Sequence, residues 1–194
     1  DLSAQQRARF SALKDQGTDM DWTDVQQKLE PLLQAAELDD QHAGLCYLIG
    51  KCYEHLGRLN EAKSWLEHAR EQDICPLRML GPMHQAVLDV AQQNRVPLMD
   101  VQEFFAQRSE GGLVGDQWLL DHVHPSVTGH QVIADELFQL LETMGLAQRP
   151  ADWAIRKKTL WQVHLASLDD AYYMHGQDHL KRLHEWSRGR IPDP

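Results

Sequence analysis

The feature that most constrains the fold is a pair of helical patterns separated by a very short connection. Apolar residues recur at helical spacing from about His42 to Leu56, and the pattern stops at Gly57, the residue expected just past a helix end. A second pattern begins near Asn60, a good N-cap, and continues to about Gln72. Because only about three residues connect them, the two helices must fold back on each other as an antiparallel hairpin.

Residues 1–40 are also predicted to be helical, with a break at 17–19. After the break, apolar residues recur at helical spacing at Val25, Leu29, Leu32, Leu33 and Ala36. Thr23 or Asp24 can cap this second helix, whereas Pro31 inside it predicts a kink or a shorter helix.

The helical segment resembles the tetratricopeptide repeat (TPR). The positions that carry the resemblance are Ile49, Gly50, Tyr53, Gly57, Leu59, Ala62, Leu66 and Ala69. The match covers one repeat, about 43–76, and Leu32 and Ala35 give a weaker echo of it earlier in the chain. The resemblance implies that the hairpins bind a protein partner or frame a substrate cleft. Since a free-standing array needs about three repeats, further repeats are expected upstream of Asp1.

Beyond the hairpin, the sequence predicts a helix followed by one buried strand. The helix follows Pro76 and runs to about residue 95, with an apolar face. The segment 96–101, Val-Pro-Leu-Met-Asp-Val, is a short and nearly continuous apolar run, which is typical of a buried strand in a parallel sheet. A helix followed by such a strand is half of an α/β unit.

Helices are predicted again in the C-terminal part. An apolar stripe indicates a helix over 132–144, with a capping box formed by Thr128 and Gln131. After Pro150, one or two helices are expected to run to about Trp186, and the tail 191–194 is expected to fray. The predicted buried side of these helices consists of Trp153, Leu160, Trp161 and Leu165.

Charge and composition exclude several classes of protein. The formal net charge is −10, which disfavours a nucleic-acid-binding protein because such proteins usually show a basic face. No window approaches about 18 consecutive apolar residues, so the sequence predicts no membrane span. Three cysteines do not make a disulfide framework, and Cys46 and Cys52 are expected to be buried thiols in a helix.

The chemistry is predicted to lie in the stretch 118–130, Trp-Leu-Leu-Asp-His-Val-His-Pro-Ser-Val-Thr-Gly-His. Asp121 and His124 are three residues apart, and Pro125 biases His124 toward an extended backbone. A tight turn can therefore bring the Asp121 carboxylate to the imidazole of His124. A carboxylate on Nδ1 fixes the tautomer and leaves Nε2 as a general base.

This stretch resembles the last conserved block of the SGNH (GDSL-type) hydrolases, which reads Asp-x-x-His-Pro followed by a glycine and a helix. The resemblance implies a three-layer α/β fold and hydrolysis of esters or removal of acetyl groups, often from carbohydrate. It makes Asp121 the acid and His124 the base of a catalytic triad. The combination with a TPR hairpin resembles a bacterial subgroup that attaches such repeats to an SGNH domain.

The nucleophile that the resemblance requires does not match any serine of this chain. The family serine lies in a Gly-Asp-Ser block near the start of the domain, and none of the seven serines here has that context. We therefore expect the serine upstream of Asp1, and we expect the chain alone to be inactive. The expected fold is mainly α, with TPR-like hairpins over 1–75, the C-terminal part of an α/β SGNH domain over 76–146, and a helical extension over 147–194.

The expected partners and cofactors follow from the same resemblance. In the intact protein, the substrate would be an ester or an acetylated carbohydrate, and the hairpins would offer a surface to a protein partner. No cofactor, metal or nucleic acid is implied. The compartment stays unknown, although the family resemblance is compatible with a bacterial protein that acts outside the cytoplasm.

Three alternatives stay open at this point. The first is a non-enzymatic TPR adaptor in which the Asp-x-x-His block is a packing turn. The second is a metal site, because Asp121, His122, His124 and His130 are potential ligands, although their spacing matches no closed site. The third is a pair, His175 and His179, that can face the same side of a helix but lacks a third ligand.

Two further residues are candidates for contacts with a substrate. Trp118 is a candidate pocket wall, and Arg78 is a candidate contact for an anionic or sugar group.

Overall fold

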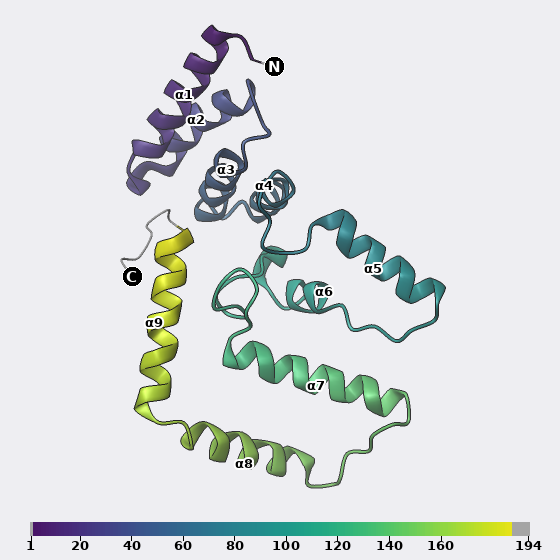
Figure 1. The fold of residues 1–194 in the computed structure, drawn as a ribbon. Coiled ribbons are helices and arrows are strands. Elements are labelled where there is room, and N and C mark those ends of the chain that lie inside the picture. The colour runs from purple at the N-terminus through teal and green to yellow at the C-terminus, as the bar shows by residue number, and fades with distance from the viewer. Residues whose placement is uncertain (1, 188–194) are drawn as a thin grey trace. The chain divides into compact units, whose positions relative to one another are not determined.

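A computed structural model describes residues 2–187, and within that range the chain is all-α (Figure 1). It divides into two compact units, Asp1–Gly115 and Asp116–Pro194. The domain boundaries predicted from the sequence at 75 and 146 stay predictions. The frayed tail predicted over 191–194 lies outside the described residues.

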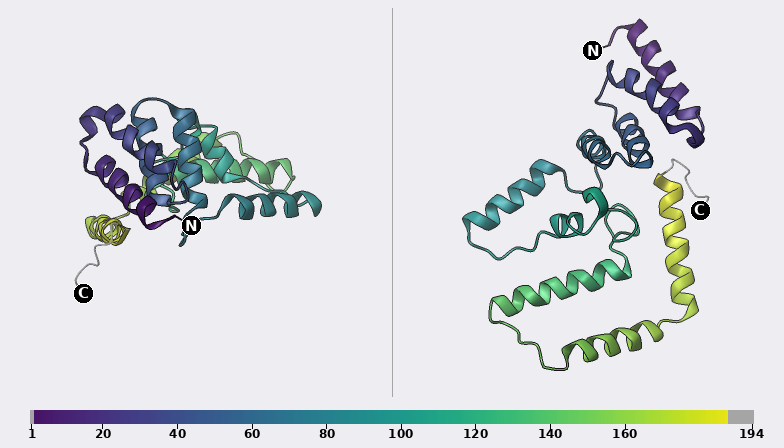
Figure 2. Two further views of the ribbon diagram at one scale, coloured as in Figure 1. Left: turned by 90° about the horizontal axis from the view of Figure 1, so that it is seen from above. Right: turned by 180° about the vertical axis from the view of Figure 1, so that it is seen from behind.

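The first unit contains two antiparallel helical hairpins. The first hairpin consists of α1 (Ala4–Asp19) and α2 (Val25–Ala36), and the second of α3 (Ala43–His55) and α4 (Leu59–Glu71). The two hairpins lie side by side through contacts between α2 and α3, as both Figure 1 and Figure 2 show. They share one apolar core, whose buried members are Val25, Leu29, Leu32, Ala35, Leu45, Ile49, Cys52, Tyr53 and Ala62.

The helix ends follow local hydrogen-bond chemistry. Asp24 caps α2, since its carboxylate accepts the backbone N–H of Gln27 at 3.0 Å. The helix α2 continues through Pro31 to Ala36, so Pro31 does not shorten it. The expected stop at Gly57 is confirmed, and this glycine has a positive φ of 71°. The N-cap of α4 is Arg58 rather than the predicted Asn60.

Two glycines allow the helices within each hairpin to come close together. A Cβ added at Gly50 would lie 2.7 Å from Cγ of Leu66 on the neighbouring helix α4. A Cβ added at Gly17 would lie 2.5 Å from Cγ of Leu32 on α2. Both hairpins therefore use a glycine in one helix to accommodate a leucine of the other.

A buried lysine closes the end of the first hairpin. The side chain of Lys28 on α2 is 1% exposed, and its Nζ donates to the carbonyl oxygens of Gly17 at 2.7 Å, Thr18 at 3.1 Å and Met20 at 2.8 Å. The same ammonium lies 4.8 Å from the ring centroid of Trp22. Since carbonyls at a helix C-terminus carry partial negative charge, the lysine satisfies groups that α1 leaves unpaired.

The predicted buried strand over 96–101 is wrong. The segment before Asp100 is irregular, and Val96 is 57% and Leu98 is 39% exposed. Asp100 instead caps the short helix α6 (Val101–Ala106) by accepting the backbone N–H of Glu103 at 3.1 Å. A strand needs a neighbouring strand to pair its backbone groups, and the described residues contain no strand. The α/β portion expected from the SGNH resemblance is therefore not seen in them.

The helix preceding this segment, α5 (Gly81–Gln93), is shorter than predicted. It begins after Leu80 and not after Pro76, because Pro82 occupies the first turn, where the missing N–H costs nothing. The side chains of Met83, Val87 and Val90, spaced along one face of α5, are 57%, 45% and 58% exposed.

The second unit contains α7 (Val127–Thr143), α8 (Trp153–Ala166) and α9 (Asp170–Ser187). The helices α7 and α8 are joined by an ion pair between Asp135 and Lys157 at 2.6 Å and by stacking of Phe138 on Trp153 at 4.5 Å between ring centroids. Of the residues predicted on the buried side of the C-terminal helices, Leu160 is 65% exposed. The other three, Trp153, Trp161 and Leu165, are half-buried.

No helix among residues 2–187 combines the length and the apolar character that crossing a membrane requires.

Candidate acid–base site

The stretch 118–126 folds into a tight loop in the second unit. Leu119 and Pro125 form an isolated antiparallel bridge. The backbone N–H of Leu120 donates to the carbonyl of His124 at 2.8 Å, and the N–H of Ser126 donates to the carbonyl of Trp118 at 2.7 Å. Pro125 has no N–H to donate, and its neighbours take part instead: His124 through its carbonyl and Ser126 through its N–H. The chain therefore turns back on itself, and the two ends of the loop, Trp118 and Ser126, meet immediately before α7.

The end of this loop is fixed to the first turn of α7. The Ser126 hydroxyl accepts the backbone N–H of Gly129 at 3.0 Å and donates to the carbonyl of Gln117 at 3.3 Å. The N-cap of α7 is therefore Ser126, and the capping box predicted at Thr128 is wrong. Ser126 precedes Thr128 and already satisfies the first turn, so the helix begins earlier than its apolar stripe indicates.

Gly129 lets the first turn of α7 lie directly against the loop. A Cβ built on Gly129 would be 2.4 Å from the carbonyl oxygen of Trp118 and 3.1 Å from Cβ of Pro125. Any side chain at this position would therefore push Trp118 and its hydrogen bond to Ser126 away from the helix.

The Asp121 carboxylate is the centre of the loop. Its Oδ1 accepts the backbone N–H groups of Val123 and His124, both at 2.8 Å, and its Oδ2 lies 2.7 Å from Nδ1 of His124. The side chain is 7% exposed. Burial raises the pKa of Asp121, but the two backbone hydrogen bonds and the His124 ring outweigh it and lower the pKa to about 2.

The His124 imidazole contacts Asp121 through Nδ1 and is otherwise largely exposed. Its side chain is 72% exposed. An ionised carboxylate is only an acceptor, so a neutral His124 ring must carry its proton on Nδ1 and keep a lone pair on Nε2. The contact expected from the Asp-x-x-His-Pro spacing is thus present. Chemically, the pair can accept a proton at Nε2 and stabilise the resulting imidazolium.

The other residues singled out from the sequence do not join this pair in a metal cluster. His122 is half-buried and His130 is exposed on the first turn of α7. Within the described part of the chain, no three histidine, cysteine or acidic side chains come together as a metal-binding group. Trp118 is half-buried, and its backbone carbonyl accepts the N–H of Ser126. Arg78 is exposed and lies in the first unit.

A second aspartate–histidine contact occurs in the first unit, and the sequence reasoning missed it. His84 Nε2 on α5 lies 3.1 Å from Oδ1 of Asp100, the N-cap of α6. Both side chains are about three-quarters buried, at 24% and 22% exposed. The same Asp100 oxygen already accepts an N–H of α6, so this contact ties α5 to α6. Sixteen residues separate the partners, and no local motif signals the contact.

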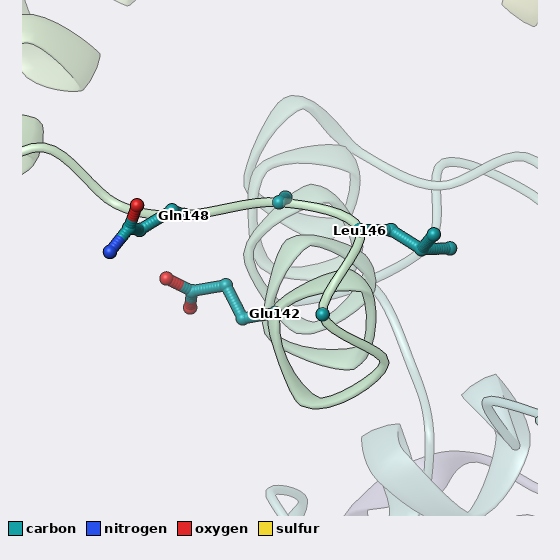
Figure 3. A pocket seen from close by; sticks show the side chains of 5 residues that line it. Glu142, Leu146 and Gln148 are labelled. Atoms are coloured by element: carbon teal, nitrogen blue, oxygen red, sulfur yellow. The ribbon is translucent and has the colours of Figure 1, made fainter.

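A hollow on the surface lies elsewhere, at the C-terminal end of α7 (Figure 3). It is lined by Glu142, Gly145, Leu146, Ala147 and Gln148, none of which belongs to the loop. Its one charged group, Glu142, binds the backbone N–H of Arg149 at 3.0 Å and Arg149 Nε at 2.7 Å. The carboxylate is therefore used to close the turn after α7.

Comparison with known proteins gives no match: no family model, no curated protein and no solved structure matches this chain.

Proposed function

We propose that this chain supplies the acid and the base of a serine ester hydrolase or deacetylase of the SGNH type. The observation that carries the proposal is the hydrogen bond between Asp121 and Nδ1 of His124, with the opposite edge of the ring exposed. The proposal is also supported by the resemblance of the Asp-x-x-His-Pro block before α7 to the last conserved block of the SGNH hydrolases. In this proposal, Asp121 orients His124, and His124 Nε2 removes the proton from a serine hydroxyl.

The proposed serine belongs to a segment outside this sequence. Ser126 is the serine nearest to the pair along the chain, and its hydroxyl is engaged by Gln117 and Gly129. With His124 72% exposed, Nε2 is accessible to a hydroxyl brought from elsewhere. The serine oxygen would attack the ester carbonyl, and His124 would then protonate the leaving group. Water activated by the same imidazole would hydrolyse the acyl-enzyme.

The test uses the natural polypeptide that contains this chain, together with single-residue variants of it. We expect it to hydrolyse p-nitrophenyl acetate and to be labelled on a serine by a fluorophosphonate probe. The change His124→Ala should lower kcat/KM by about a thousandfold and abolish labelling, since the serine loses its base. The matched control is His122→Ala, which removes a histidine two residues away and should leave both signals unchanged. Equal rates in the two variants would refute the assignment of His124.

The second candidate is a non-enzymatic protein-interaction module of the TPR type. The observation that favours it is the pair of antiparallel hairpins α1–α2 and α3–α4. In each hairpin, a glycine of one helix packs closely against a leucine of the other. In this case the Asp121–His124 contact would serve only to shape the turn before α7. A natural polypeptide that neither hydrolyses the ester nor reacts with the fluorophosphonate would favour this candidate over the hydrolase.

A further inference from the structure

A second histidine pair stands apart from the proposed acid–base site, on the last helix of the second unit. His175 and His179 are four residues apart on α9, and their Nε2 atoms are 3.1 Å apart. The ring centroids are 4.5 Å apart, and both side chains are exposed. Residues at i and i+4 share one face of a helix, and a hydrogen bond joins the two nitrogen atoms.

We propose that His175 and His179 form a bidentate site for a divalent transition-metal ion of the Cu²⁺ or Ni²⁺ kind. Both Nε2 atoms would be ligands in their neutral form. The remaining coordination positions would be taken by water, because no third histidine, cysteine or acidic side chain joins the pair in the described chain. The proposal does not depend on the function of Asp121 and His124.

The distance between the two nitrogen atoms allows one metal ion to bind both of them. With metal–nitrogen bonds of about 2.0–2.1 Å, a separation of 3.1 Å gives an N–metal–N angle of about 95–100°. A tetrahedral centre with the same bonds would need nitrogen atoms about 3.3–3.4 Å apart. The observed spacing lies between that value and the roughly 2.8–3.0 Å that separates adjacent positions of a square-planar or octahedral centre, so the exposed side chains can serve either geometry with small rotations. Cu²⁺ binds nitrogen ligands most tightly in the divalent series, and imidazole also suits Ni²⁺.

Metal binding at this place would also strengthen α9. Within the second unit, this helix packs extensively against no other described helix. On it, Tyr172 is 60% and Met174 is 66% exposed. A helix with little tertiary support depends on local interactions along its own surface. A metal ion bound at i and i+4 cross-links one turn and stabilises the helical backbone between its ligands.

The experiment titrates NiCl₂ and CuCl₂ separately into the untagged full chain. A pH of 7.5 is used because imidazole binds a metal ion only in its neutral form. Isothermal titration calorimetry measures affinity and stoichiometry, and circular dichroism at 222 nm measures helix content. We expect one site per chain that disappears on adding EDTA, together with a gain in helix content. His175→Ala and His179→Ala should each weaken binding about tenfold or more, because a chelate becomes a single ligand.

The matched control keeps the number of histidines and changes only their spacing. Combining Gln177→His with His179→Ala places two histidines at i and i+2, which do not face each other on a helix. This variant should lose the tight site and the gain in helix content, whereas His164→Ala, at an exposed position on α8, should retain both. The proposal is overturned if the i, i+2 variant binds as tightly as the parent, or if His164→Ala weakens binding equally.

Discussion

Replacing Asp121 by asparagine tests whether its charge holds the loop together. The pKa of this carboxyl is lowered from 3.8 to about 2, and each pKa unit corresponds to about 1.4 kcal/mol. The ionised form therefore stabilises the folded loop by about 2 kcal/mol, mainly through the N–H groups of Val123 and His124. Because the pKa is lowered, this stability is fully present above about pH 4 and is lost as the pH falls toward 2.

Hydrogen exchange at the backbone N–H of Ser126 measures this loss directly. This N–H is bonded to Trp118 and not to the carboxylate, so it reports on closure of the loop. At pH 6 we expect Asp121→Asn to lower its protection factor by about 30-fold, the equivalent of about 2 kcal/mol. The difference between the two proteins should shrink as the pH approaches 2, where about half of the parent carboxyl groups are protonated.

The same substitution should also change the tautomer of His124. An asparagine amide can present its NH₂ group to Nδ1, and the ring proton would then move to Nε2. Long-range ¹H–¹⁵N NMR distinguishes the two tautomers. The control is Asp116→Asn, which removes an equal charge from an exposed position just before the loop. An Asp121→Asn variant with parental protection at pH 6 and an unchanged tautomer would refute the reasoning.

Three further predictions concern stability and reactivity. Gly129→Ala should cost about 1–3 kcal/mol through overpacking against the loop, measured by the same exchange experiment, and unchanged protection would contradict the close approach described above. Lys28→Met should lower the free energy of unfolding in urea by about 3 kcal/mol, because three carbonyls lose a charged donor. The change Lys14→Met should cost far less, and equal costs would contradict a special role for the buried lysine. In the native protein, Ellman's reagent should react readily with Cys75 alone, since the other two thiols are buried, and burial raises the pKa of Cys46 to about 11. Rapid reaction of all three thiols would refute this.

The parts of the fold that depend on neighbouring residues could be predicted from the sequence. The hairpin ending at Gly57 follows from periodicity and a glycine stop, both of which act within one or two turns. The contact between Asp121 and His124 also followed from a spacing of three residues and a proline. Its role in catalysis stays a prediction, because no comparison and no geometric feature tests it.

The parts that depend on distant partners could not be predicted. The segment 96–101 has the composition of a buried strand, but composition does not provide a neighbouring strand. The contact between His84 and Asp100 depends on how the chain returns after α5, and no short motif encodes that path. The cap of α7 was misplaced by two residues, because Ser126 and Thr128 are both good caps and the choice depends on how the loop packs on Gly129.

The hydrogen bonds described above for the acid–base loop join residues between Gln117 and His130 along the chain. Closing so short a loop costs little chain entropy, and these bonds join residues that are close together in the sequence. The arrangement is therefore portable: a protein engineer can move this stretch, together with the start of α7, onto another helix. The imidazole would keep its carboxylate partner there, and the surface that faces Nε2 would have to be designed anew.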